Sequence, residues 1–276
     1  MSPRPPFPFK SLLIFVTGAV ILRALTMAAW VYFPGDGLVP QLGRILIPSG
    51  FAVALVVLNL RLLARDGFPA DALGLRLTRA HLAGFLGGGL VMGLIIVGLA
   101  GVFRLLVPFH YERGPLSGLA LGLHALEYLG GNTTEELIFR GYLFLVLHRH
   151  LGLPAALAIT GVLFGVFHLP GLSGMAAVKM VATTFLGGTL FAYGFLLTRS
   201  LWTAFGLHAV GNLVLHQILG LSGKPSLLTP HIDGPWPSAY DPTLVSWLIV
   251  FVPVLAIASL LHQRQKSGRQ IRATLA

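Results

Sequence analysis

The chain has 276 residues, of which 55% are hydrophobic and only 10% are charged, and its mean hydropathy is +0.82. These values exclude an ordinary soluble domain and predict an integral membrane protein. The net charge of +10 does not indicate a nucleic acid partner, because Lys and Arg lie between apolar segments, where membrane topology and anionic lipids explain them. A sequence without cysteine has no disulfides, thiolate nucleophiles or zinc–thiolate sites.

Apolar segments predict an all-α, polytopic membrane protein with about eight transmembrane helices around an intramembrane polar cavity. The first segment, residues 9–33, has the length of a spanning helix and exceeds the core of a typical signal peptide. Pro and Gly clusters separate seven further segments. These cover residues 41–64, 80–107, 116–147, 153–169, 175–198, 201–219 and 243–262. Together they form a single integral membrane domain over residues 1–276.

Glycines mark two special places in these segments. The segment at 116–147 is too long for one simple crossing, and Gly130-Gly131, followed by Asn132-Thr133, indicates a place where its helix breaks or kinks. The glycine triplet at 87–89 is expected to allow close helix packing, because no strand precedes it as a phosphate-binding loop requires.

The positive charges indicate orientation, because short cytoplasmic loops carry the excess of Lys and Arg. With the N-terminus inside, only Arg113 and Lys224 fall in outer loops. We therefore expect both termini in the cytoplasm and, from the preference for Arg over Lys, a bacterial cytoplasmic membrane. Arg23 and Arg44 lie within spans and are interpreted as anchors whose side chains extend to the membrane interface.

Two adjacent acids and an arginine stand out in the fourth segment. On a helix, Glu135 and Glu136 point about 100° apart and cannot both face one cleft. Glu136 and Arg140 have the i, i+4 spacing and the order that favour an ion pair. Glu135 is then free to accept a proton from water. The alternative is a capping box, in which Asn132 or Thr133 begins a new helix and one of the acids completes the cap.

Three further polar residues lie in later segments. His168 ends the run Phe164-Gly165-Val166-Phe167-His168, and His208 and Asn212 share one helix face through their i, i+4 spacing. Each alone is often a packing residue that hydrogen-bonds to another helix. Together with Glu135 they predict a shared site within the membrane.

These residues carry a resemblance. Glu-Glu-x-x-x-Arg at 135–140, Phe-x-x-x-His at 164–168 and His-x-x-x-Asn at 208–212, in this order, resemble the motifs of the CPBP intramembrane proteases. That family includes CAAX prenyl endopeptidases of the Ras-converting enzyme type and bacterial homologues linked to bacteriocin maturation and self-immunity. The resemblance covers about residues 70–215, including Leu73-Gly74-Leu75-Arg76 before the third span.

The resemblance implies an endopeptidase that cleaves a membrane-associated or lipidated peptide or protein. Glu135 would activate water with help from His168, and His208 and Asn212 would stabilise the oxyanion, while Glu136 and Arg140 support the site. Two histidines and a glutamate can ligate zinc, but a His-Glu-x-x-His motif is missing from the sequence and the glutamate mechanism needs no metal, so we expect no metal cofactor. The sequence specifies neither the substrate nor an oligomeric state.

Three other functions fit parts of the sequence. A non-enzymatic membrane scaffold or bacteriocin-immunity protein could keep the same motifs. A rhomboid-like serine protease is indicated weakly by the Gly-x-Ser-Gly strings around Ser173 and Ser222. A transporter could use intramembrane Glu and His as a proton relay, although inverted halves are not evident in the sequence.

Overall fold

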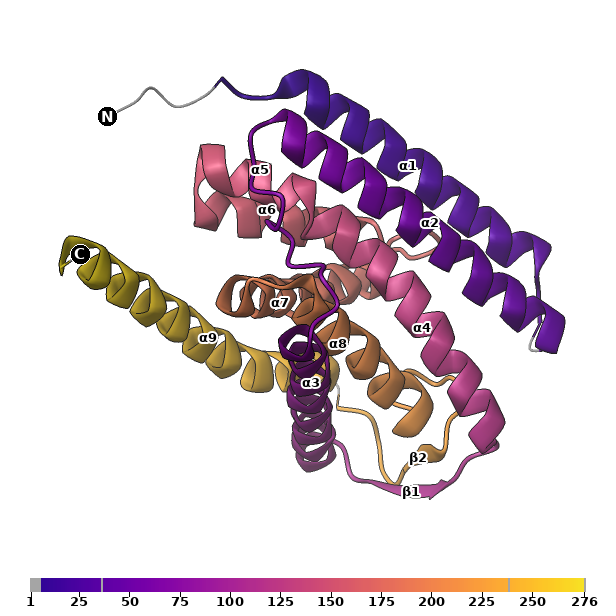
Figure 1. The fold of residues 1–276 in the computed structure, drawn as a ribbon. Helices are drawn as coiled ribbons and strands as arrows, with labels where there is room; N and C mark the ends of the chain where they lie inside the picture. The colour runs from indigo at the N-terminus through magenta and orange to yellow at the C-terminus, as the bar shows by residue number, and fades with distance from the viewer. Residues whose placement is uncertain (1–5, 36, 238, 276) are drawn as a thin grey trace.

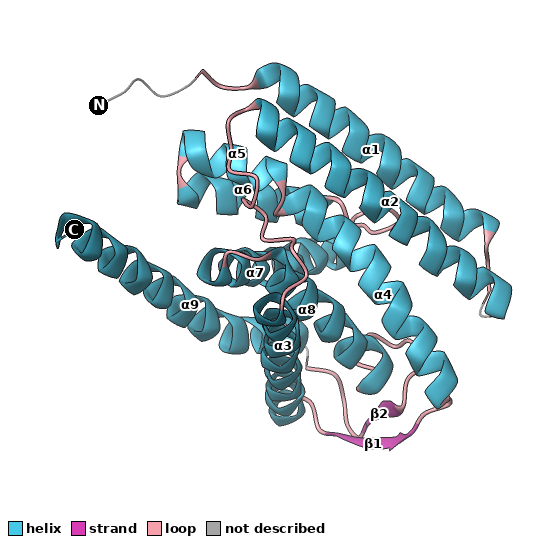
Figure 2. Cartoon of the chain, viewed as in Figure 1, coloured by secondary structure: helices cyan, strands magenta, loops and turns pink. Residues whose placement is uncertain are grey.

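The computed structural model describes residues 6–35, 37–237 and 239–275. Helices make up 75% of the chain, which confirms the all-α class, and Figure 2 shows that strands occupy only one edge of the molecule. The elements in chain order are α1 (Phe9–Tyr32), α2 (Leu38–Arg65), α3 (Arg79–Leu106), β1 (Phe109–Arg113), α4 (Gly118–Phe139), α5 (Tyr142–Leu151), α6 (Leu153–Val166), α7 (Gly174–Thr198), α8 (Leu201–Asn212), the π-helix η1 (Leu213–Ile218), β2 (Leu228–Ile232) and α9 (Pro242–Leu275).

Five of the described helices are long and apolar enough to cross a membrane, namely α1, α2, α3, α7 and α9. Large apolar side chains on these helices are exposed, for example Leu90 and Leu94 at 65% and 64%. Such an exterior suits contact with lipid rather than water. The prediction of about eight crossings is not confirmed, because it also requires α4, which carries several acids, the 14-residue α6, and the 12-residue α8 with its extension η1.

The first helix begins, and the last helix ends, on the same side of the molecule (Figure 1). In Figure 1, α1 and α2 lie side by side along the top and α4 runs next to α2. The helix α1 begins, and α9 ends, on the left of this view, whereas β1 and β2 lie at the lower right. The two strands pair antiparallel, with His110 opposite His231, and so join two loops that are distant in sequence.

The predicted helix break at Gly130-Gly131 is wrong. The helix α4 continues through both glycines, and Ser117 caps its first turn by accepting a hydrogen bond from the backbone N–H of Ala120. Gly130 instead permits close packing on α2, because an added Cβ would lie 2.7 Å from Ser49 Oγ. Since no described helix starts at Asn132 or Thr133, the capping box is also excluded as the reason for the two acids.

The long fourth segment does divide, but one turn after the acids. The helix α4 ends at Phe139 and α5 starts at Tyr142, whose backbone N–H donates to Asn59 Oδ1 of α2 over 2.6 Å. An added Cβ on Gly141 would lie 2.2 Å from the same oxygen. A side chain of α2 therefore caps α5 across the interface, and this turn accommodates only glycine.

Close backbone approaches hold α8 against α3, as the glycine triplet predicts. An added Cβ on Gly88 would lie 2.6 Å from the Thr203 carbonyl oxygen, and one on Gly206 would lie 2.0 Å from the Phe85 carbonyl oxygen. At the start of α8, Ser200 Oγ donates to the Gly74 carbonyl over 3.0 Å. These contacts fix the helix that carries His208 and Asn212.

Candidate active site

The three motifs meet where α4, the end of α6 and α8 come together. Glu135 Oε2 lies 3.6 Å from His168 Nε2 and 3.8 Å from His208 Nε2. The side chains of Glu135 and His168 are 15% and 25% exposed, whereas that of His208 is 5% exposed. The structure therefore brings one carboxylate and two imidazoles together, with Glu135 and His168 on the more accessible side.

Both imidazoles are held through the nitrogen that points away from Glu135. His168 Nδ1 lies 2.7 Å from the Phe164 carbonyl oxygen, and His208 Nδ1 lies 2.8 Å from Glu136 Oε1. Both partners accept hydrogen bonds, so Nδ1 of each ring carries a hydrogen, as assigned from these contacts. In its neutral form each ring then presents the Nε2 lone pair toward Glu135 Oε2.

The predicted helical ion pair is confirmed. Arg140 Nη1 lies 3.1 Å from Glu136 Oε1, and both side chains are fully buried. The guanidinium also lies 4.4 Å from the Phe164 ring centroid, a favourable cation–π distance. Gly188 of α7 makes room for it, because an added Cβ would lie 2.3 Å from Arg140 Nη2. Glu136 therefore contacts both Arg140 and the back of His208.

Asn212 ends α8 one turn beyond His208. Its Nδ2 donates to Asn132 Oδ1 of α4 over 3.3 Å. The structure places Asn212 on the same side of α8 as His208, as the spacing predicts, and joins it to α4 through a residue that the motif does not include.

Sequence reasoning missed three neighbours of the site. Asn132 bonds to Asn212, and the Phe191 ring stacks on His208 with 4.5 Å between centroids. Arg23, interpreted above as an interfacial anchor, lies 4.0 Å from the Phe167 ring and attracts the Glu135 carboxylate electrostatically. A charge in the middle of an apolar span was the available signal for Arg23. Arg44 is likewise buried, with its Nε 3.2 Å from Glu127.

The side chains of the site are of the types that bind zinc, because Glu135, His168 and His208 supply carboxylate and imidazole ligands. Among the described residues, no group of three such side chains is arranged to hold an ion as it stands. The residues thus fit a metal by chemical type and not by their present positions.

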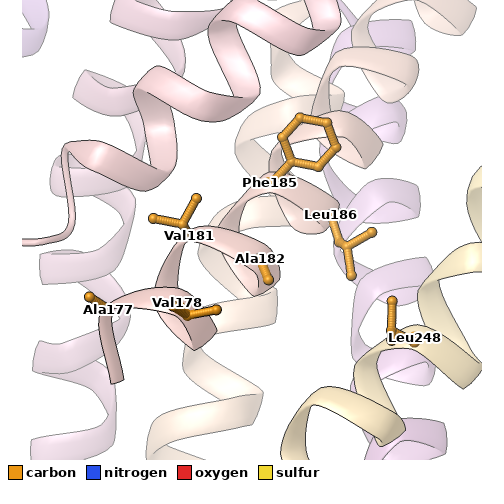
Figure 3. A pocket seen from close by; sticks show the side chains of 7 residues that line it. All are labelled: Ala177, Val178, Val181, Ala182, Phe185, Leu186 and Leu248. Carbon is orange, nitrogen blue, oxygen red and sulfur yellow. The ribbon is translucent and has the colours of Figure 1, made fainter. Parts of the chain in front are cut away.

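An apolar groove of about 560 Å³ lies away from these polar residues, between α7 and α9 (Figure 3). No side chain that lines it has a group that could activate water. The lining residues are Ala177, Val178, Val181, Ala182, Phe185, Leu186 and Leu248. The groove therefore offers an apolar surface, whereas the polar side chains gather around Glu135.

The two candidate nucleophilic serines do not form a comparable site. Ser173 and Ser222 are both exposed, and Ser173 lies directly before α7. In the part of the chain that the structure describes, neither hydroxyl hydrogen-bonds to a histidine. A rhomboid-like mechanism thus has no support from the geometry.

Residues 115–214 match the family model of the Rce1-like type II CAAX prenyl endopeptidases. This match confirms the resemblance drawn from the three motifs, and it contains all of the motif residues. No curated protein matches the chain.

The Rce1-like match indicates a protease of the CAAX type, and hence a hydrolase. It does not favour the non-enzymatic alternative. Together with the apolar helices, it identifies an integral membrane protein. The broader family-like core at about residues 70–215 stays a prediction, as do the roles of individual residues.

Proposed function

We propose that this protein is an intramembrane endopeptidase in which Glu135 activates water to hydrolyse a peptide bond of a membrane-associated or lipidated peptide or protein. The observation that carries the proposal is the position of Glu135 Oε2, which lies within 4 Å of two imidazole Nε2 atoms, each held from behind. Glu135 and neutral His168 are two neighbouring acceptors, and a water molecule has the two donors that such a pair requires.

The reaction would proceed through a tetrahedral intermediate. Glu135 takes one proton as the water oxygen attacks the carbonyl carbon, and the carbonyl oxygen becomes an oxyanion. Asn212, and His208 when it carries protons on both nitrogens, donate hydrogen bonds to that oxygen, while Glu136 offsets the charge of His208. The proton then passes to the amide nitrogen, the oxyanion re-forms the C=O bond as the C–N bond breaks, and the carboxylic acid gives its remaining proton to the released amine, so a carboxylate and an ammonium group leave.

The substrate class is tested with an internally quenched peptide that ends in a farnesylated Cys-a-a-X sequence. Wild type should cleave it and Glu135→Gln should not, whereas Glu112→Gln, the same change on the exposed β1 strand, should keep wild-type activity. Membrane peptides from cells with wild type and Glu135→Gln are compared in parallel. If wild type does not cut the farnesylated peptide, a membrane peptide that accumulates only in cells with Glu135→Gln identifies the substrate class and the cleavage site. Equal cleavage by Glu135→Gln, or no difference in either experiment, contradicts the proposal.

Asn212→Ala tests the oxyanion role. Loss of one such donor commonly costs about 10²–10³ in rate, so the variant should fold and cleave the probe about that much more slowly. Its thermal midpoint should fall modestly, because the variant loses the hydrogen bond to buried Asn132, but the protein should remain folded at the assay temperature. Wild-type activity in this variant would remove Asn212 from the mechanism.

We also propose that hydrolysis needs no metal. Protein treated with a chelator and shown by metal analysis to be metal-free should keep full activity. Recovery of a lost activity by zinc alone would overturn this part of the proposal and make Glu135, His168 and His208 zinc ligands.

The cellular setting forms part of the proposal. The protein would act in a bacterial cytoplasmic membrane with both termini inside, as supported by the distribution of Lys and Arg and by the common side on which α1 begins and α9 ends. Its partners would be the bilayer and the lipidated or membrane-bound substrate.

A further inference from the structure

Asn132 extends the site by one helical turn. Asn132 and Glu135 are i and i+3 on α4, so their side chains share one face of that helix. His208 and Asn212 share one face of α8 in the same way. Two contacts therefore join the helices, one between Glu135 and His208 at 3.8 Å and one between Asn132 and Asn212 at 3.3 Å.

The hydrogen bonding of Asn132 is incomplete. Its Oδ1 accepts from Asn212, but its Nδ2 is buried and has no partner, although the residue is only 5% exposed. A buried polar atom without a partner destabilises the folded protein unless a ligand supplies the missing hydrogen bond. The hydroxyl of Thr134, two residues further along, is by contrast satisfied by the carbonyl oxygens of Pro48 and Gly130.

At least one N–H of this pair of amides lacks a partner whichever way the two carboxamides are oriented. Each carboxamide has two N–H donors, and the bond between Asn132 and Asn212 uses one of these in either orientation. The others are left to bind an acceptor. One turn away, Glu135 Oε2 is also buried without a hydrogen-bond donor. This face of α4 thus offers an acceptor suited to water and a donor suited to a carbonyl oxygen.

We propose that Asn132 is a further catalytic residue, which together with Asn212 forms a pair of carboxamides that donates hydrogen bonds to the oxygen of the cleaved peptide carbonyl as it becomes an oxyanion. This inference rests on the proposed function, because it assumes that a peptide carbonyl lies beside Glu135. Its ligand is the oxyanion at the cleaved bond, to which Asn132 would be a donor in addition to Asn212.

The test compares variants of the full-length protein on the farnesylated quenched peptide. Asn132→Ala should lower kcat by about 10²–10³ with little change in KM, since an oxyanion donor acts mainly in the transition state. The matched control is Thr133→Ala, whose side chain points about 100° away on α4 and which should keep wild-type kcat. Thermal midpoints show whether the variants are folded.

A second variant separates binding from positioning. Asn132→Asp has the same shape and keeps an oxygen for Asn212, but it lacks N–H donors, so its kcat should fall at least as far as that of Asn132→Ala. A trifluoromethyl ketone analogue of the peptide, whose hydrate resembles the tetrahedral intermediate, should bind both variants more weakly by a factor that follows the loss in kcat/KM.

The outcomes are distinct. Wild-type kcat in Asn132→Asp, or unchanged affinity for the ketone, would overturn the donor role of Asn132. Full activity of Asn132→Ala in an enzyme that Glu135→Gln inactivates would do the same and leave the proposed function standing. Activity in Glu135→Gln would instead refute the proposed function itself.

Discussion

Glu135 and Glu136 have the same side chain and adjacent positions, yet their surroundings differ. Glu136 is fully buried and contacts Arg140 and His208, whereas Glu135 faces the two imidazole Nε2 atoms and retains 15% exposure. Helix geometry alone predicts this division, because neighbouring residues cannot face one cleft. It does not predict the role proposed for Asn132, since a buried amide nitrogen without a partner is visible only once its surroundings are known.

The buried Arg140 depends on the size of residue 188. In Gly188→Ala the new Cβ would lie 2.3 Å from Arg140 Nη2 and 2.9 Å from Phe164 Cδ1. Overpacking of this kind typically costs about 1–3 kcal/mol, so we expect a lower thermal midpoint and, through Glu136 and His208, lower activity. Gly187→Ala is the control, because its nearest contact would be Phe191 Cζ at 3.7 Å. Equal stability of the two variants would contradict this account.

At the scale of elements, hydropathy located the helices but not their junctions. The predicted segment 201–219 is α8 followed by the π-helix η1, and the two predicted loops that flank 116–219 contain the paired strands β1 and β2. The glycine pair at 130–131 was misread as a break because the sequence does not show that Ser49 of α2 lies against Gly130. Packing between distant helices decides how such glycines are used.

The interface between α3 and α8 leads to a second prediction. Gly206→Ala would place a Cβ 2.0 Å from the Phe85 carbonyl oxygen, and backbone atoms cannot rotate aside. We expect α8 to move away from α3, with a marked fall in thermal midpoint and a loss of cleavage, because α8 carries His208 and Asn212. Gly98→Ala on α3 meets no atom within 4 Å and should be neutral or slightly stabilising, since alanine favours helices. A wild-type midpoint in Gly206→Ala would be inconsistent with this packing.

The strands β1 and β2 carry a pH-dependent contact. His110 Nδ1 lies 2.6 Å from Asp233 and its Nε2 lies 3.4 Å from Glu112, with the His231 ring stacked beside it. The hydrogen bond to Asp233, followed by that to Glu112, raises the pKa of His110 above its ordinary value of 6.5. A raised pKa means that this contact stabilises the fold fully below about pH 6.5 and ceases to do so as the pH rises through the folded-state value.

His110→Gln should therefore lower the thermal midpoint more at about pH 5.5 than at about pH 8.5. In an Asp233→Asn background, His110→Gln should lower the thermal midpoint by nearly the same amount at both pH values, because the main carboxylate partner of His110 is then missing. An equal effect of His110→Gln at both pH values would show that the contact contributes independently of the charge on the imidazole.

At the scale of the whole molecule, composition predicted the membrane class, whereas the number of crossings did not follow from apolar length alone. The helices that carry the candidate site fall outside the span criterion for two reasons: α4 contains acids that a membrane disfavours, and α6 and α8 are shorter than a helix that crosses a bilayer.

The natural sequence contains no cysteine, so single introduced cysteines report topology without background. Ser222 lies in the turn before β2 and Ser267 near the end of α9, and both are exposed. We expect a membrane-impermeant maleimide to label Ser222→Cys in intact cells and Ser267→Cys only after permeabilisation. Labelling of both from the same side would contradict the proposed crossing of α9.

The pairing of β1 with β2 has a consequence for how the chain is held together. Residues 109–113 lie before the Rce1-like segment and residues 228–232 lie after it, so the chain on its two sides pairs in one sheet. The last helix, α9, packs against α7 and α3, and Lys179 of α7 forms an ion pair with Asp241 directly before α9, with 3.0 Å between their charged atoms. Backbone hydrogen bonds between β1 and β2 would therefore hold the two sides of this segment together even if the exposed turn at 222–223 were cut.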